Sequence, residues 1–162
     1  RTKAYSMGLG EIYVNLRGRE AQGIVEPGAE YDALRAEIRS GLLELVDEAT
    51  GRKPVENVYT REEAYGSFDP NVIPDIFVTN SEGYRVSWQA SLGVVTPDLF
   101  EENRQVWSGD HCSVDPDVVP GILFSSRPLR TDPRPSMADV PATVYKVLGL
   151  APPEKLDGEP LF

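Results

Sequence analysis

The chain has 162 residues, 40% of them hydrophobic, which is enough for one ordinary domain with a real core and short for two. Its formal net charge of −10 argues against general binding to nucleic acid or to an anionic membrane, since both need a basic face. No stretch approaches the ~20 apolar residues of a membrane span. The lone cysteine excludes an intramolecular disulfide, so the cellular compartment stays open.

Strands and a long helix are predicted in the first half of the chain. Residues 11–16, EIYVNL, alternate apolar with other side chains, which is the period of a half-buried strand. The GLG before them is interpreted as a turn, because Tyr13 replaces the third glycine of a dinucleotide-binding loop. Between residues 29 and 46 apolar side chains recur every three or four positions, which predicts an amphipathic helix. Further extended pieces are expected at residues 54–60, 75–79 and 82–88.

The second half of the chain is expected to contain much loop, since 14 residues of the chain are proline. Residues 89–120 have no sustained period, and an irregular stretch of that length is uncommon in a compact domain unless it is functional. Residues 121–126, GILFSS, predict a strand. A last helix near 137–148 carries a capping-box pattern, with Ser136 as N-cap and Asp139 three residues on. Strands alternating with amphipathic helices indicate an α/β architecture.

The only histidine and the only cysteine are neighbours inside the long loop, in the stretch WSGDHCSVDP. A neutral imidazole is the commonest metal ligand, and oxygen ligands beside it suit zinc, manganese or iron. His111 is therefore a candidate metal ligand, with a surface histidine in a polar turn as the alternative. Asp110 is better placed to orient the ring than to bind the same ion. One histidine cannot complete a His-rich site, so the other ligands would come from elsewhere.

Nucleophilic catalysis has little support within this chain. Cys112 has no second histidine to activate it and no CxxC partner, so we interpret it as a small structural residue. Ser108 and Ser113 lack the G-x-S-x-G elbow of serine hydrolases. A catalytic triad is therefore not predicted.

Several blocks of the chain are similar to one family. GDHCSVDPDVVPGILFSSRP (109–128) and SMADVPATVYKVLGLAPPEKLDGEPL (136–161) resemble the C-terminal part of the alkaline phosphatase superfamily. The similarity is to its predicted phosphohydrolase/phosphomutase branch, which is related to type I phosphodiesterases and nucleotide pyrophosphatases. TKAYSMGLGEIYVNLRGREAQGIVEPGAEYDAL (2–34) and PDIFVTNSEGYRVSW (74–88) resemble the same branch. The resemblance covers nearly the whole chain, and the C-terminal combination is its specific part.

This resemblance implies a three-layer α/β/α sandwich, of which residues 1–162 would be a single region from the C-terminal portion of the catalytic domain. It also implies attack by a Thr or Ser nucleophile held between two divalent ions, zinc typically, with manganese or iron possible. His111 matches the late histidine ligand of one ion. The family's nucleophile and its Asp-x-x-x-His ligand pairs have no match here, so the reaction centre is expected to be incomplete. A start at Arg1 without Met agrees with a piece of a longer protein.

The function implied is a phosphoric ester hydrolase acting on a phosphodiester, a nucleotide or a small phosphomonoester. A phosphomutase of the same superfamily and a non-catalytic acidic α/β binding module are the alternatives. The expected partners are the phosphate-ester substrate and the remainder of the catalytic domain, with no nucleic-acid polymer and no membrane. Arg17, Arg19 and Glu20 are candidate substrate contacts, because Arg binds phosphate bidentately, with a solvated turn as the alternative.

Overall fold

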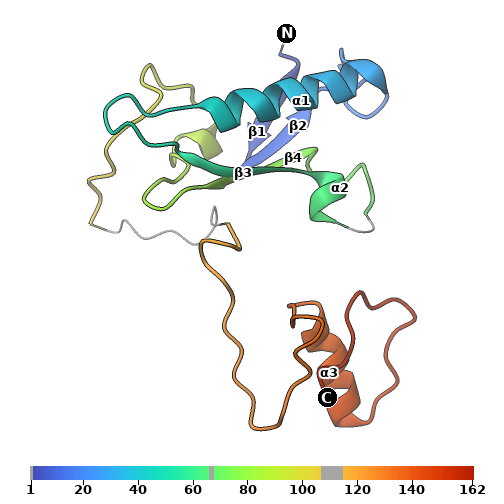
Figure 1. Ribbon diagram of the computed structural model, residues 1–162. Helices are drawn as coiled ribbons and strands as arrows, with labels where there is room; N and C mark the ends of the chain where they lie inside the picture. The colour runs from blue at the N-terminus through green and yellow to red at the C-terminus, as the bar shows by residue number, and fades with distance from the viewer. Residues whose placement is uncertain (1, 66–67, 107–114) are drawn as a thin grey trace. The chain divides into compact units, whose positions relative to one another are not determined.

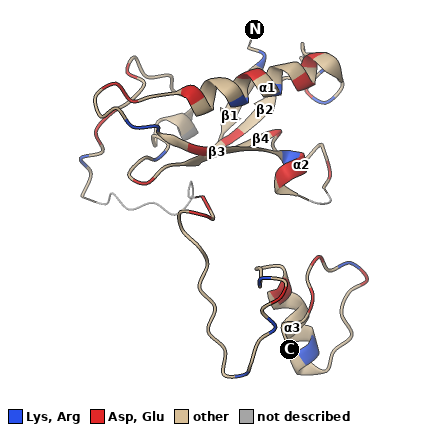
Figure 2. Ribbon diagram, in the orientation of Figure 1, with Lys and Arg blue, Asp and Glu red and all other residues tan. Residues whose placement is uncertain are grey.

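The computed structural model describes residues 2–65, 68–106 and 115–162 (Figure 1). The chain forms two compact units, residues 1–120 and 121–162, which are described separately. Helices and strands both occur, which confirms the predicted mixed α/β class. Acidic and basic side chains are dispersed over both units (Figure 2). Among the described residues, no helix has the length and apolar character needed to cross a bilayer.

Four short strands form one antiparallel sheet in the first unit, in the order β1-β2-β4-β3. They are β1 (Ala4–Met7), β2 (Glu11–Val14), β3 (Val55–Thr60) and β4 (Ile76–Asn80). Ile12 pairs with Ile76 in the central pair, which places the apolar side chains of both strands on one face. The strands predicted at 11–16, 54–60 and 75–79 are confirmed, each to within two residues.

The GLG sequence forms the turn between β1 and β2, as predicted. Gly8 and Gly10 both have positive φ, +72° and +138°. A Cβ atom on Gly10 would lie only 2.4 Å from the carbonyl oxygen of Val78 in β4. Glycine is therefore required there both by the backbone conformation and by the close approach of β4.

Helix α1 (Ala29–Glu44) confirms the helix predicted at 29–46 and covers one face of the sheet (Figure 1). Two clusters of buried side chains make the core beneath it: Val14, Val25 and Tyr31 in one, and Val55, Val58 and Ile76 in the other. Tyr31 is on α1 itself, and Ile38 and Leu42 of the helix pack on the second cluster. The apolar side chains whose spacing predicted the helix are thus the ones that pack on the sheet.

The opposite face of the sheet, here called the outer face, carries polar and aromatic side chains. Successive residues of a strand point to opposite faces, and Val58 and Val78 both pack in the core cluster under α1. Asn57, Tyr59 and Thr79, which alternate with them, therefore lie on the outer face. Their hydroxyl and amide groups are available to hold another segment of the chain.

Irregular segments connect and follow the strands. β3 continues into α2 (Arg61–Ala64), a single helical turn closed by a capping box. After β4, residues 81–106 contain only one short 3-10 helix, η1 (Ala90–Leu92). The extended piece predicted at 82–88 is therefore not a strand. Tyr84 N–H donates to the carbonyl of Ser81, so this segment begins with a turn instead of joining the sheet.

The second unit contains one helix, α3 (Asp139–Leu148), close to the predicted 137–148. Half of the predicted capping box forms: the Asp139 carboxylate accepts the backbone N–H of Ser136 at 2.8 Å, but no side chain caps the helix N-terminus. Gly149 ends the helix in the left-handed conformation, as its position predicted. Leu161 N–H donates to the Thr143 hydroxyl at 3.0 Å, so the end of the tail packs on the helix.

The strand predicted at 121–126 is wrong for the described structure, since none of these residues belongs to a strand. Ile122 and Phe124 are 81% and 91% exposed. Their apolar, β-prone character produced the prediction, but a strand also needs a neighbouring backbone to accept its hydrogen bonds. The described residues supply no such neighbour here.

Candidate functional site

Asp75, immediately before β4, is a fully buried carboxylate, with 0% of its surface exposed. Arg19 donates to it through both terminal nitrogens, at 2.9 Å to Oδ1 and 2.6 Å to Oδ2. The Tyr31 hydroxyl and the Val14 N–H each donate at 2.6 Å, and Arg61 Nη1 lies 3.2 Å from Oδ1. Desolvation alone would raise the pKa of Asp75, but the hydrogen bonds hold that pKa below its usual value. Asp75 is therefore ionised and fully paired.

Arg19 and Glu20, two of the candidate substrate contacts, belong to this buried cluster. Arg19 Nη2 also donates to the Val14 carbonyl at 2.8 Å, and Arg19 Nε donates to Glu20 Oε1 at 2.8 Å. The second Glu20 oxygen accepts the Leu16 N–H at 2.7 Å. These two side chains fasten the loop after β2 to the sheet. The polar groups of Arg19 and Glu20 are therefore engaged inside the protein.

Arg17 differs from Arg19 in its surroundings. Its side chain is 62% exposed and forms an ion pair with the exposed Glu26 at 3.0 Å. An exposed pair of this kind is worth little and is easily broken by a competing anion. Arg17 is the member of the group whose guanidinium faces solvent, and its predicted contact with substrate stays a prediction.

Asp115 is a second carboxylate with no exposed surface, and it lies on the outer face of the sheet. Its Oδ2 atom accepts three hydrogen bonds, from Asn57 Nδ2 at 2.9 Å, the Tyr59 hydroxyl at 2.9 Å and the Thr79 hydroxyl at 2.8 Å. Its Oδ1 atom accepts the backbone N–H of Asp117 at 2.8 Å. Burial alone would raise the pKa of Asp115, but these donors hold that pKa below its usual value.

His111, the predicted metal ligand, lies outside the described residues, as do Asp110, Cys112, Ser108 and Ser113. The description resumes at Asp115, four positions after His111. The role of the histidine therefore stays a prediction. The sequence reasoning missed Asp115 itself, because a single Asp-Pro in a loop carries no sign of burial. The polar residues at alternate positions of β3, Asn57 and Tyr59, were the signal that could have indicated a polar contact there.

The described residues offer few groups that could bind a metal ion. They include no cluster of three or more His, Cys, Asp or Glu side chains with the proximity of a metal site. The carboxylates of Asp75 and Asp115 are already occupied by donors from the protein. In the described part of the chain these two side chains thus serve as hydrogen-bond acceptors.

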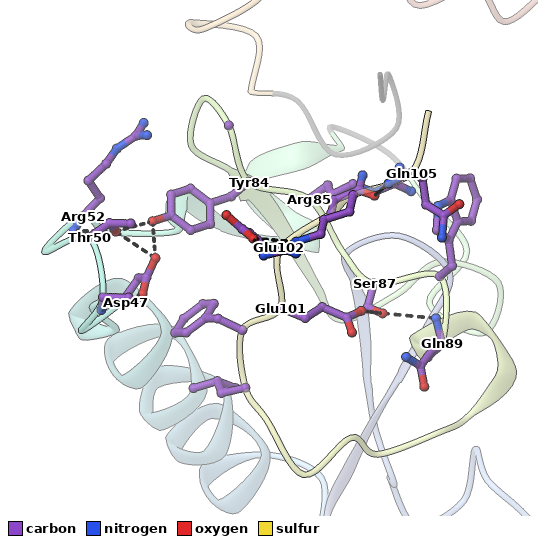
Figure 3. A pocket seen from close by; sticks show the side chains of 17 residues that line it. Asp47, Thr50, Arg52, Tyr84, Arg85, Ser87, Gln89, Glu101, Glu102 and Gln105 are labelled. Carbon is purple, nitrogen blue, oxygen red and sulfur yellow. Dashed lines mark hydrogen bonds and ion pairs between the residues drawn. The ribbon is translucent and has the colours of Figure 1, made fainter. Parts of the chain in front are cut away.

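An open cavity of about 780 Å³ is formed by the turn after α1 and by the irregular segments after β4 (Figure 3). On one side of it, Asp47 Oδ2 accepts hydrogen bonds from the hydroxyls of Thr50 and Tyr84, both at 2.7 Å. On the other side the Ser87 hydroxyl donates to Glu101 at 2.8 Å. The lining of the cavity thus combines charged groups of both signs with apolar side chains such as Leu99 and Phe100. No pattern in the sequence predicted this cavity.

In comparisons with known proteins, no family model, no curated protein and no solved structure matches the chain. The family resemblance is therefore carried by the quoted motifs alone.

Proposed function

We propose that this chain belongs to a metal-dependent phosphoric ester hydrolase of the alkaline phosphatase superfamily and contributes one metal ligand, His111, to it. The motif combination around residues 109–128 and 136–161 is the basis of the proposal. In this proposal the two units are parts of a three-layer α/β/α catalytic domain. The remaining metal ligands and the nucleophile would come from the rest of that domain.

The observation that carries the proposal beyond the motifs is the burial of Asp115. If WSGDHCSVDP were an ordinary polar surface turn, its second aspartate would be expected to face water. Instead the Asp115 carboxylate is fully buried and accepts four hydrogen bonds. A loop whose end is fixed in this way is suited to hold a ligand in place, since ligand geometry depends on its supporting contacts.

The exposed apolar side chains of residues 121–126 support the proposed sandwich. Ile122 and Phe124 would be half or fully buried if this segment were a strand inside a larger sheet. Their exposure in the described structure is what we expect for such a strand when the neighbouring strands are missing. The proposed domain supplies those neighbours.

Two alternatives differ from this proposal in their chemistry. A phosphomutase would use the same phosphoenzyme chemistry and transfer the phosphoryl group to an acceptor hydroxyl in place of water. A non-catalytic binding module is favoured by the open cavity of about 780 Å³, which could hold a ligand without any reaction centre (Figure 3). The same cavity is compatible with the hydrolase.

The test uses a protein that carries this chain together with the rest of the proposed catalytic domain. Purified with zinc, it should hydrolyse bis-p-nitrophenyl phosphate or p-nitrophenyl phosphate, and a chelator should abolish the turnover until zinc is restored. Added alcohols that accept the phosphoryl group in place of water would favour the mutase. Absence of both metal and turnover in that protein would leave the binding module as the better hypothesis.

A further inference from the structure

The open cavity beside the turn after α1 lies entirely within the first unit, and described residues form its lining. We propose that this cavity binds a neutral carbohydrate, whose hydroxyl groups and apolar ring face match the two kinds of side chain in the lining. Its volume of about 780 Å³ falls within the range of ~300–1,000 Å³ that is typical of small-molecule sites. This inference goes beyond the proposed function and does not rest on it.

One part of the lining is an aromatic wall around Tyr84. The Tyr84 ring meets Phe100 edge-on, with 6.3 Å between the ring centroids, and the Arg52 guanidinium lies over the Tyr84 ring at 5.4 Å. The Tyr84 hydroxyl donates to Asp47 at 2.7 Å, and Arg52 Nη2 donates to the carbonyl of Glu82 at 2.6 Å. The wall is therefore fixed before a ligand binds, which lowers the entropic cost of binding.

Two further apolar side chains of the lining are exposed to water. The Arg85 guanidinium lies over the Trp88 ring, 4.1 Å from its centroid, yet 56% of Trp88 is exposed, and Leu99 is 74% exposed. Apolar side chains surrounded by polar groups are typical of ligand sites, because a ligand that covers them removes apolar surface from water. The C–H groups on one face of a pyranose ring suit this contact, since the face of an aromatic ring is electron-rich.

The charged groups of the lining balance one another. The lining contains three carboxylates and three guanidinium groups, which belong to Asp47, Glu101, Glu102, Arg52, Arg85 and Arg104. A phosphate or another anion in the cavity would face the carboxylates, and an organic cation would face the guanidinium groups. Charge complementarity therefore favours a ligand without net charge.

The same mixture of groups suits hydroxyl groups in particular. A hydroxyl both donates and accepts, whereas a phosphate dianion only accepts and an ammonium group only donates. Carboxylates offer acceptors, guanidinium groups offer donors, and the side-chain amides of Gln89, Asn103 and Gln105 offer both. Glu101 Oε1 accepts the Ser87 hydroxyl at 2.8 Å, and no hydrogen bond among the described residues uses Glu101 Oε2 (Figure 3). That second oxygen is the acceptor we assign to a sugar hydroxyl.

The first measurement is the binding of neutral sugars to the 162-residue chain. Maltotriose, cellotriose and chitotriose differ in the linkage and substituents of their pyranose rings, and each is titrated by isothermal calorimetry without added metal. We expect at least one of them to bind. Its affinity should change less than about twofold between about 0.05 and 0.5 M NaCl, because salt screens charges that a neutral ligand does not use.

Two substitutions of exposed side chains test whether the sugar lies in the cavity. Trp88→Ala should weaken the binding by about fivefold to tenfold, the effect of losing one aromatic contact. Glu101→Gln should weaken it by about tenfold, because an acceptor of hydroxyl groups is replaced by an amide of the same size that also donates. Circular dichroism and the melting temperature check that both variants remain folded.

Tyr65→Ala is the matched control. Tyr65 is an aromatic side chain of the same unit that is 42% exposed, packs on Phe77 and lies outside the cavity lining. Its replacement should leave the sugar affinity unchanged. If none of the three sugars binds at millimolar concentration, or if Tyr65→Ala weakens the binding as much as Trp88→Ala does, the cavity is not a carbohydrate site and the inference is overturned.

Charged probes complete the test, under the same conditions. Inorganic phosphate, adenosine monophosphate and spermidine should each bind more weakly than the best of the three sugars. If one of them binds more tightly and loses that affinity in Trp88→Ala and Glu101→Gln, the cavity takes a charged ligand and the inference is overturned. Sugar binding in a protein whose complete proposed domain has neither metal nor turnover would refute the proposed function alone, and turnover without sugar binding would refute this inference alone.

Discussion

Asp75 and Arg19 are joined by two hydrogen bonds, of 2.9 and 2.6 Å, at a site where Asp75 exposes nothing to solvent. This pair connects the loop after β2 to the start of β4. Tyr31 of α1 and Arg61 of α2 reach the same carboxylate, so four separate segments meet at one charge. The pair is therefore the principal polar contact inside the first unit, and its removal should be costly.

Replacing Asp75 by Ala should destabilise the chain by about 3–5 kcal/mol, because the buried Arg19 would keep only Glu20 as an acidic partner and the buried Tyr31 hydroxyl would lose its acceptor. Urea unfolding followed by circular dichroism measures this change. Arg17→Ala is the matched control: it breaks the exposed pair with Glu26 and should cost less than about 1 kcal/mol. Equal losses for the two variants would contradict the importance of the buried cluster.

Stability should fall in acid through the buried carboxylates. The folded pKa of Asp115 is below its ordinary value, so its contribution is complete above the unfolded pKa of about 3.9 and is lost as the pH falls through the lower, folded pKa. Urea midpoints of the parent chain should therefore be nearly constant between about pH 7 and 5 and decrease below about pH 4. Asp115→Asn should show a shallower decrease, and an unchanged acid slope in this variant would contradict the assignment.

Glycine substitutions should have opposite signs in the turn and in the helix. Gly10→Ala should destabilise the chain by more than about 1 kcal/mol, because its φ of +138° is unfavourable for alanine and the new Cβ would meet the Val78 carbonyl oxygen. Gly41→Ala lies in α1 with nothing within 4 Å of the new atom. It should stabilise by about 0.5–1 kcal/mol. Thermal melts of the two variants and the parent chain measure both changes: the melting temperature should fall for Gly10→Ala and rise for Gly41→Ala.

The sequence predicted those elements whose local signals and tertiary surroundings agree. The apolar face of α1 was predicted from the spacing of its residues alone, and in the structure that face packs on the sheet. The strand predicted at 121–126 fails for the opposite reason, since its apolar residues indicate burial but a strand depends on a neighbour that local sequence does not specify. The segment at 82–88 fails because its turn hydrogen bonds are formed in place of pairing with the sheet.

The candidate site was less predictable than the fold. Arginine is a residue type that often binds phosphate, so Arg19 was a reasonable candidate. Only its hydrogen bonds to Asp75, which is 56 positions away in the sequence, show that the guanidinium is used inside the protein. The burial of Asp115 likewise depends on Asn57 and Thr79, which lie on different strands. Both are long-range pairings: the alternating polar residues of β3 could indicate a polar contact, but no local pattern identifies the residue that makes it.

By itself the 162-residue chain should bind zinc weakly and hydrolyse p-nitrophenyl phosphate or its bis-ester negligibly. The physical reason is that one histidine fills only one of the several positions a catalytic zinc requires. Isothermal titration with zinc chloride and a chelator-controlled hydrolysis assay measure both. Tight stoichiometric zinc, or turnover that a chelator removes, would show that the chain contains a complete site.

Replacement of His111 by Ala in the protein carrying the complete proposed domain should reduce metal occupancy and turnover together. An imidazole there would be one of few protein ligands on its ion, so its loss should cost at least the 10–100-fold typical of residues that only orient ligands. Asp110→Asn should cost less, since an orienting carboxylate leaves the ligand itself in place, and Cys112→Ser should be close to neutral. Metal content by atomic absorption and hydrolysis rate, measured on all three variants, test the order. If His111→Ala kept normal metal and rate while Cys112→Ser lost both, the loop would be a thiol site and the assignment of the imidazole would be wrong.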